Sequence, residues 1–271
     1  TNIEEIGKQA FYACLSLQEI KIPKNVKTID WGTFEECNFL EKIVIPSNVI
    51  KINDSAIDKD SNVTIYCKTG SIAQKYAIEN NKNYIIDDVA PTVKFTSDSV
   101  KNIKKEHNVI IEVQDDMEEV GLDENSLKYQ WTQSKEEPSK ESFTENFENG
   151  QTITKNTGDG DWYLWVYAED NLGNEIIARS EAFYFDNTAP SVNVEYSTKE
   201  ITKENVMVTI KSNEEIQEMT GWTLSSDKKT LTKEYNVNTK ETITVKDIAG
   251  NETQANIEIS NIDKNLPETT I

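Results

Sequence analysis

Carboxylates are the reactive side chains that this sequence supplies in quantity, and the groups that nucleophilic catalysis needs are scarce. The 271 residues include 48 Asp and Glu against 28 Lys and Arg, which gives a formal net charge of −20. His107 is the single histidine, and it lies in a polar stretch that we interpret as a solvated turn. A Ser/His/Asp or Cys/His centre would depend on this one residue. We therefore expect no catalytic centre and no enzyme activity in this chain.

The three cysteines, Cys14, Cys37 and Cys67, do not form a recognisable chemical site. An odd number of cysteines cannot form a closed disulfide framework. Their separations of 23 and 30 residues are also unlike the ligand spacing of a zinc site. We interpret all three as small buried apolar residues.

Charge and hydropathy exclude several classes of partner. The acidic excess argues against nucleic acid, because a phosphate-binding surface needs clustered Lys and Arg, and it argues equally against an anionic membrane surface. No stretch approaches the roughly 18 consecutive apolar residues of a membrane-spanning helix. Residues 1–6 also lack the pattern of a signal peptide. We expect a monomer without membrane insertion.

The carboxylates are concentrated in the middle of the chain, where the chemistry that they favour is the binding of a hard cation. Residues 88–187 carry 22 acidic and 9 basic side chains. Carboxylate oxygens are the ligands that calcium prefers in proteins. Whether these side chains converge depends on the elements that carry them.

A 23-residue repeat defines the elements of the N-terminal region. The residues that this shift superposes are Ile6 and Ile29, Phe11 and Phe34, Cys14 and Cys37, Leu17 and Leu40, Ile20 and Ile43, Ile22 and Ile45, Pro23 and Pro46, Asn25 and Asn48, and Val26 and Val49. In each unit the spacing Leu-x-x-Ile-x-Ile is that of a leucine-rich repeat, a short strand whose apolar side chains point into a solenoid core. Each repeat buries its apolar side only by stacking on a neighbour.

The opposite side of these predicted strands supplies our candidate ligand-binding residues. Glu19 and Lys21 in one repeat, and Lys42 and Val44 in the next, alternate away from the core and are predicted to line a concave sheet. Tyr66 ends the predicted last strand and completes this candidate set.

The array is predicted to end in a short helix. Ser71 is placed to cap it, and Ile72, Tyr76 and Ala77 share one apolar side. We interpret this helix as the terminal cap of the solenoid.

Two recurring phrases bracket the remaining chain. Asp88-Val89-Ala90-Pro91 returns as Asn187-Thr188-Ala189-Pro190, and Asp170-Asn171-Leu172-Gly173-Asn174 returns as Asp247-Ile248-Ala249-Gly250-Asn251. Between them, period-two alternation predicts strands at residues 109–113, 127–131, 162–168, 176–185, 192–196, 206–210, 231–235, 242–245 and 256–259. Strands at this spacing, without long helical segments, predict antiparallel sandwiches, and the Gly-Asn turns predict tight hairpins.

These motifs resemble two families of bacterial surface proteins. The phrase Ile6-Gly7-x-x-Ala10-Phe11 and the Ile-Pro-x-x-Val-x-x-Ile run are similar to BspA-like leucine-rich repeats. The segments that contain Trp162 and Gly221-Trp222, each followed by an Asp-x-x-Gly-Asn phrase, resemble bacterial immunoglobulin-like domains. The resemblance implies a mainly β chain with the C-terminal part of a leucine-rich-repeat solenoid and its capping helix (1–87), two immunoglobulin-like β-sandwiches (88–187 and 188–263), and the start of a further module or a tail (264–271).

The same resemblance implies a function outside the cell. We expect a non-enzymatic segment of a cell-surface or cell-wall protein of a Gram-positive bacterium, in which the repeats present an adhesive face to an extracellular protein or glycan and the sandwiches form a stalk. The alternative is a carbohydrate-binding or spacer region of a larger surface hydrolase.

In an immunoglobulin-like topology, the start of the first strand, the second-to-third-strand loop and the last hairpin gather at one pole. This places Asp87, Asp88, Asp115, Asp116 and Asp170 near one another, at the joint with the repeats. The corresponding group at the next joint is Asp186, Glu214, Glu215 and Asp247. Calcium binding that stiffens the joint is one interpretation. Mutually screened, solvated carboxylates are the other, because no fixed calcium-loop spacing is present.

An aromatic row supports the glycan alternative. If Trp162 and Leu164 face the core, then Tyr163, Trp165 and Tyr167 stand on the opposite face, where they could stack on sugar rings. The other interpretation is that the polar stretch 133–160 folds back over the row.

The phrase Leu266-Pro267-Glu268-Thr269-Thr270 is reminiscent of the sortase signal of wall-anchored proteins. It lacks the glycine of that signal, and no apolar tail follows it. Its alignment with the Ala-Pro phrases favours the first strand of a third sandwich.

Overall fold

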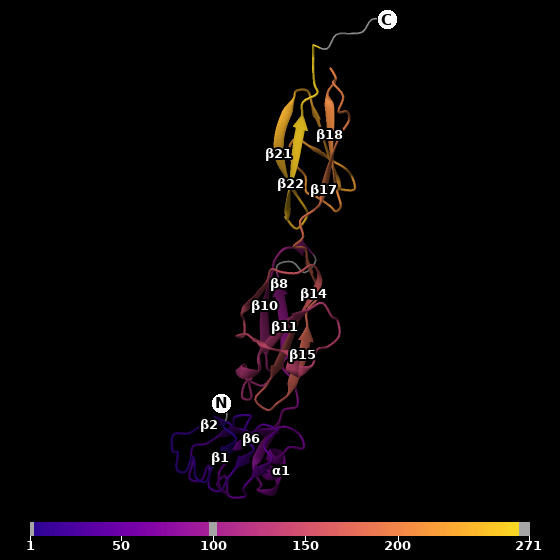
Figure 1. Cartoon of the computed structure of the whole chain (residues 1–271). Helices are drawn as coiled ribbons and strands as arrows, with labels where there is room; N and C mark the ends of the chain where they lie inside the picture. Colours follow the sequence, from indigo (N-terminus) through magenta and orange to yellow (C-terminus); the bar gives the residue numbers. More distant parts are fainter. Residues whose placement is uncertain (1–2, 98–101, 266–271) are drawn as a thin grey trace. The chain divides into compact units, whose positions relative to one another are not determined.

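The structure is a computed structural model that describes residues 3–97 and 102–265 (Figure 1). The phrase at residues 266–270 therefore lies outside the described residues. Contacts divide the chain into two compact units: Thr1–Thr96, Val109–Ile153 and Tyr163–Glu181 form the first, and Ser97–Asn108, Thr154–Trp162 and Ala182–Ile271 form the second. No helix within the described ranges has the length and apolar character to cross a bilayer.

The N-terminal repeats form two parallel ladders of short strands in the first unit. One ladder contains β1 (Glu5–Ile6), β3 (Thr28–Ile29) and β5 (Lys51–Ile52). The other contains β2 (Glu19–Lys21), β4 (Lys42–Val44), β6 (Thr64–Cys67) and β7 (Asn83–Ile86). The register pairs Ile6 with Ile29 and Ile20 with Ile43, as the 23-residue shift predicts. The repeated isoleucines stack because each strand pairs with the equivalent strand of the next turn.

The repeat core is closed by the predicted helix, α1 (Ile72–Glu79). Ser71 accepts a hydrogen bond from the Gln74 amide, and the helix buries Ala73, Tyr76 and Ala77. Residues 63–66 were predicted as the last strand, but β7 follows the helix and pairs in parallel with β6. Cys37 and Cys67 are buried in this core, Cys14 is half-buried, and all three are free thiols.

The rest of the first unit contains antiparallel strands that follow directly on the repeats. One sheet has the order β13 (Thr152–Lys155), β10 (His107–Gln114), β8 (Thr92–Ser97). The other brings together β12 (Glu145–Asn146), β11 (Lys128–Thr132), β14 (Gly160–Glu169) and β15 (Glu175–Arg179). Two 3-10 helices, Glu124–Ser126 and Lys140–Ser142, lie in the connections. Leu164, Val166 and Ala168 are fully buried, as predicted for the core side of β14.

The second unit contains the beginning of β14, which pairs with β16 (Phe183–Phe185); β16 in turn pairs with β9 (Ile103–Lys104). It also contains β17 (Val192–Tyr196), β18 (Val206–Ser212), β19 (Thr223–Leu224), β20 (Thr230–Tyr235), β21 (Thr239–Lys246) and β22 (Glu252–Ile259). These last six strands form a sheet in the order β17-β18-β20-β19 and a separate hairpin, β21-β22. Apolar side chains from both, including Val208 and Ile257, form a single core.

The environment of His107 and the strand predicted at 176–185 also differ from the sequence-based expectations. His107 lies in β10, fully buried against the rings of Phe183 and Phe185, because its ring fills apolar space while Nε2 lies 3.1 Å from the Tyr184 carbonyl oxygen. The strand predicted at 176–185 is two strands, β15 and β16. Between these two strands the Ser180 side chain bonds to β14: its hydroxyl accepts a hydrogen bond from the Leu164 amide (2.9 Å).

Candidate functional site

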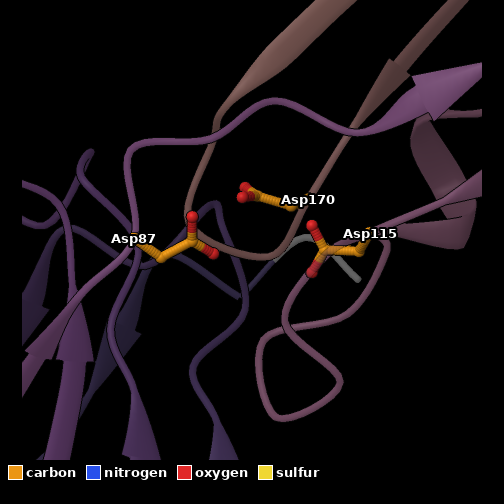
Figure 2. Close-up of side chains that lie close together, drawn as sticks. All are labelled: Asp87, Asp115 and Asp170. Carbon is orange, nitrogen blue, oxygen red and sulfur yellow. The ribbon is translucent and has the colours of Figure 1, made fainter.

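Three carboxylates converge in the first unit, each at the end of a strand. Asp87 follows β7, Asp115 follows β10 and Asp170 follows β14. One oxygen from each lies within 4.8 Å of the others. Figure 2 shows the three groups turned toward a common space from separate segments of the chain. We call this group the Asp87 triad.

The Asp87 triad is asymmetric in its hydrogen bonding. Asp170 accepts three hydrogen bonds: Oδ1 accepts from the amides of Leu172 and Asn174 (both 2.8 Å), and Oδ2 accepts from Asn174 Nδ2 (2.6 Å). Asp87 Oδ1 accepts from the Val89 amide (2.9 Å), but its Oδ2 is buried without a hydrogen-bond partner. Both carboxylate oxygens of Asp115 are likewise buried without a partner. Three buried oxygens of Asp87 and Asp115 are therefore unpaired, and one oxygen of each residue belongs to the group within 4.8 Å.

The electrostatic environment of the triad disfavours three negative charges. Burial raises the pKa of Asp115 to about 6, and the charges of Asp170 and Asp87 act in the same direction. Burial also raises the pKa of Asp87, against the opposing Val89 hydrogen bond. Burial raises the pKa of Asp170 despite the hydrogen bonds from Asn174. Like charges at this separation repel one another strongly when water is excluded.

The Asp-x-x-Gly-Asn phrase builds one side of the triad. It forms the turn between β14 and β15, in which the Asp170 amide donates to the Asn174 carbonyl (3.0 Å) and Gly173 adopts a φ of 87°. Only glycine adopts this backbone conformation readily. Asn174 Nδ2 also donates to the Asp87 carbonyl (3.2 Å), so the turn holds the segment that leaves the repeats.

A second triad repeats this arrangement within the second unit. It contains Asp186, Glu214 and Asp247, again with ligand atoms within 4.8 Å of one another. Asn251 donates from its amide and from Nδ2 to Asp247, and Nδ2 also donates to the Asp186 carbonyl (2.9 Å). Burial, followed by the charges of Asp186 and Asp247, raises the pKa of Glu214. Glu215 lies outside the triad and pairs with Lys228.

The structure brings together three of the five predicted calcium ligands. Asp88 is exposed and accepts a hydrogen bond from the Thr69 amide (2.9 Å), and Asp116 is exposed on the loop after β10. Sequence reasoning placed these two beside their neighbours, but adjacent residues at the end of a strand point in different directions.

The predicted concave face lies at the contact between the repeats and the following strands. Val44 and Tyr66 are buried with Val120 and Leu172 in one apolar cluster. Lys21 Nζ donates to the Val120 carbonyl (2.7 Å), and Lys42 pairs weakly with Glu119 at 3.9 Å. Of the five candidates, Glu19 is exposed without such a contact to the following strands among the described residues.

Ion pairs with two buried carboxylates, Asp123 and Glu169, reinforce this contact, and sequence reasoning missed them. Lys24 Nζ, from the repeats, lies 2.6 Å from Asp123 and 3.1 Å from Glu169. Burial opposes the charged form of Lys24, but the hydrogen bond to Asp123 and the charge of Glu169 raise its pKa overall. Lys140 pairs with the other oxygen of Glu169 at 2.5 Å. No spacing signal identifies these residues, because they come from distant segments.

The aromatic row is covered rather than exposed. Tyr163, Trp165 and Tyr167 are each at most 5% exposed. Phe143 packs on Tyr167 with ring centroids 6.0 Å apart, and the Arg179 guanidinium lies over Tyr163 (5.1 Å) and Trp165 (5.6 Å). Lys135 and Lys140, from the predicted covering stretch, lie over Tyr163 and Tyr167. The row therefore offers no open platform for a sugar ring.

Comparison with known proteins identifies the N-terminal region. Residues 1–85 match the family described as BspA type leucine rich repeat region, in 6 copies. This match agrees with the two parallel ladders of short strands that these residues form. No curated protein matches the chain. The solved human desmocollin-1 ectodomain matches 70% of this chain at 14% identity, but the TM-score of 0.28 is too low to indicate a shared fold. The match spans 40% of that chain's length.

Proposed function

We propose that this chain is a non-enzymatic segment of a bacterial surface protein, in which the BspA-type repeats bind an extracellular protein and the following strands form immunoglobulin-like supporting domains. The observation that carries the proposal is the contact between the repeats and the next strands. It combines the apolar cluster of Val44, Tyr66, Val120 and Leu172 with the ion pairs of Lys24. An extensive contact of this kind suits a part that holds a binding region in a fixed orientation.

Two further observations support the assignment. The repeat family is one whose members are often surface proteins. His107 is fully buried between phenylalanine rings, which supports a non-catalytic role because its ring is not accessible to a substrate. The immunoglobulin-like assignment rests on the antiparallel hairpins and on the shared core of the strands from β17 to β22.

The partner-binding surface must lie outside the covered part of the concave face. We place it on the loops that precede β4 and β6, where residues 37–41 and 58–62 line a surface hollow. Phe39 is one of the lining residues, and 61% of its surface is exposed. An exposed aromatic ring next to a depression is a common anchor in protein interfaces.

The test is binding of the full chain to a panel of immobilised extracellular-matrix and serum proteins. We expect Phe39→Ala to weaken the binding by at least tenfold, because truncation of an anchor residue removes about 2 kcal/mol of binding free energy. Ile50→Ala is the matched control, since Ile50 is similarly exposed but lies in the loop between β4 and β5. Equal affinity of the two variants would reject this surface, and no binding by the wild-type chain would reject the adhesive role.

A further inference from the structure

We propose that the Asp87 triad is a calcium site, formed by Asp87, Asp115 and Asp170, that ties the end of the repeats to the two loops beside it. The proposal does not depend on the partner-binding surface. It rests on the unpaired buried oxygens of the triad and on the direction in which they point (Figure 2).

The decisive atom is Asp87 Oδ2. Asp87 is 2% exposed, its Oδ2 is buried without a hydrogen-bond partner, and the other two carboxylates lie on the same side. A buried carboxylate oxygen without a donor loses the hydration that stabilised it in water, at a considerable free-energy cost. In the second triad Asp247 is held by Asn251, and no such orphaned oxygen occurs among its described members. The proposal therefore covers the first triad alone.

Both oxygens of Asp115 are also buried and unpaired, and one of them lies within 4.8 Å of the other two carboxylates. The Gly121 amide lies near enough to lower the pKa of Asp115, but its hydrogen bond goes to the Met117 carbonyl (2.9 Å). The charges that act most on Asp115 are those of Asp170, Asp87 and Asp116, and all are negative. A cation supplies both the missing interaction for these oxygens and the missing positive charge.

The ligand chemistry identifies the cation. The triad offers only carboxylate oxygens, which are hard ligands that select Ca²⁺ or Mg²⁺ over the metals that prefer sulfur or nitrogen. Magnesium demands a near-ideal octahedron and gives up its waters reluctantly, whereas calcium accepts about six to eight oxygens in irregular arrangements. Three carboxylates from three separate strand ends form an irregular, partly dehydrated site, which favours calcium.

The site would have a mechanical consequence inside the first unit. Asp87 ends the repeat region, whereas Asp115 directly follows β10 and Asp170 directly follows β14. A bound ion would join these segments directly, in addition to the hydrogen bond from Asn174 Nδ2 to the Asp87 carbonyl. Calcium binding should then slow hydrogen exchange at the Val89 amide, which donates to Asp87.

The test compares Asp115→Asn with Asp116→Asn in the full chain. The change Asp115→Asn leaves the shape of the side chain almost unaltered and keeps one oxygen acceptor for the Gly121 amide. Asp116 is its exposed neighbour outside the triad, so its variant controls for general charge. Calorimetric titration with CaCl2 should show that Asp115→Asn binds one equivalent of calcium fewer than the wild type. Asp116→Asn should bind as much calcium as the wild type.

Thermal unfolding gives a second readout, in which Asp115→Asn should act in opposite directions with and without calcium. At calcium about 100-fold above its dissociation constant, the wild-type midpoint for the first unit should rise by roughly 5–10 °C over a NaCl control of equal ionic strength. In Asp115→Asn the calcium-dependent rise should disappear. The calcium-free midpoint of this variant should nevertheless be higher than that of the wild type, because one of three repelling charges is gone.

Three results would overturn the proposal. Undiminished calcium binding by Asp115→Asn would show that the triad is not the site. An equal loss of calcium binding in Asp116→Asn would show that the loss reflects the net negative charge and not a specific site. An equal response to MgCl2 would reject calcium selectivity. Asp87→Asn, which retains the Oδ1 that accepts the Val89 amide, provides an independent variant and should lose the same equivalent.

Discussion

At the scale of single residues, a buried lysine organises one side of the repeat region. Lys82, between α1 and β7, is buried and donates from Nζ to the carbonyls of Asp58, Lys59 (2.8 Å) and Ser61 (3.0 Å). Burial lowers its pKa, against the charge of Asp58. The ammonium group thus satisfies three carbonyls of a loop that has no strand partner of its own, which explains why a charged residue is tolerated there.

Replacement of this lysine should therefore be costly. Lys82→Met keeps the length of the side chain but removes the donors, and we expect it to lower the free energy of unfolding by about 2 kcal/mol, because carbonyls that shared a charged donor lose it. Denaturant unfolding monitored by circular dichroism measures the change. Lys75→Met is the control, since the Lys75 side chain is exposed and pairs with Glu79 at only 3.8 Å. Similar effects of the two changes would contradict this account.

At the scale of elements, the Asp-x-x-Gly-Asn turn is used twice with different surroundings. Gly173, between β14 and β15, has a φ of 87°, and Gly250, between β21 and β22, has a φ of 86°. A Cβ atom at Gly173 would lie 3.3 Å from Ser47 Oγ of the repeats, whereas one at Gly250 would meet nothing within 4 Å. The glycine position of this turn therefore has free space around it in one unit and is packed against the repeats in the other.

The two glycines form a matched pair for mutation. Gly250→Ala should destabilise the second unit by about 1 kcal/mol through backbone strain alone. Gly173→Ala should destabilise the first unit by more than this, because the new Cβ adds a tight contact with Ser47 to the same backbone strain. This contact lies beside the hydrogen bond from the Ser47 amide to the Leu172 carbonyl (3.1 Å). Differential scanning calorimetry of both variants measures the two costs. A larger effect at Gly250 would be inconsistent with this contact.

At the scale of the whole molecule, the main structural fact is that the repeats do not end as an independent domain. The first unit contains the repeats together with residues 109–153 and 163–181. Leu172, at the tip of the hairpin turn, is fully buried with Val44 and Tyr66 of the repeat sheet. The turn and the repeat sheet therefore share a core, and we expect them to unfold together.

Truncation of the shared side chain tests this coupling. Leu172→Ala should lower the free energy of unfolding of the first unit by about 2–4 kcal/mol. It should also split the unfolding of this unit into two transitions and speed hydrogen exchange at the Ser47 amide. Ile257→Ala is the control: Ile257 is equally buried, but in the core of the second unit. It should lower stability without changing exchange at Ser47. Faster exchange at Ser47 in both variants would show that the effect is global.

The sequence by itself determined the elements whose partners lie one period or one turn away. The 23-residue spacing predicted the pairing of Ile6 with Ile29 and Ile20 with Ile43, because in a stacked array each strand meets the equivalent strand of the next repeat. Ser71 as a helix cap followed from local hydrogen bonding alone. The two Asp-x-x-Gly-Asn hairpins followed from the backbone freedom of glycine.

The tertiary structure decided every property that depends on segments far apart in the chain. It buried His107 between Phe183 and Phe185, covered Trp165 with Arg179, and closed the concave face at Tyr66. It also selected Asp87, Asp115 and Asp170 from five candidate carboxylates. The physical reason is that spacing fixes which face of a strand a side chain occupies, whereas only the packing of whole elements determines what stands opposite that face.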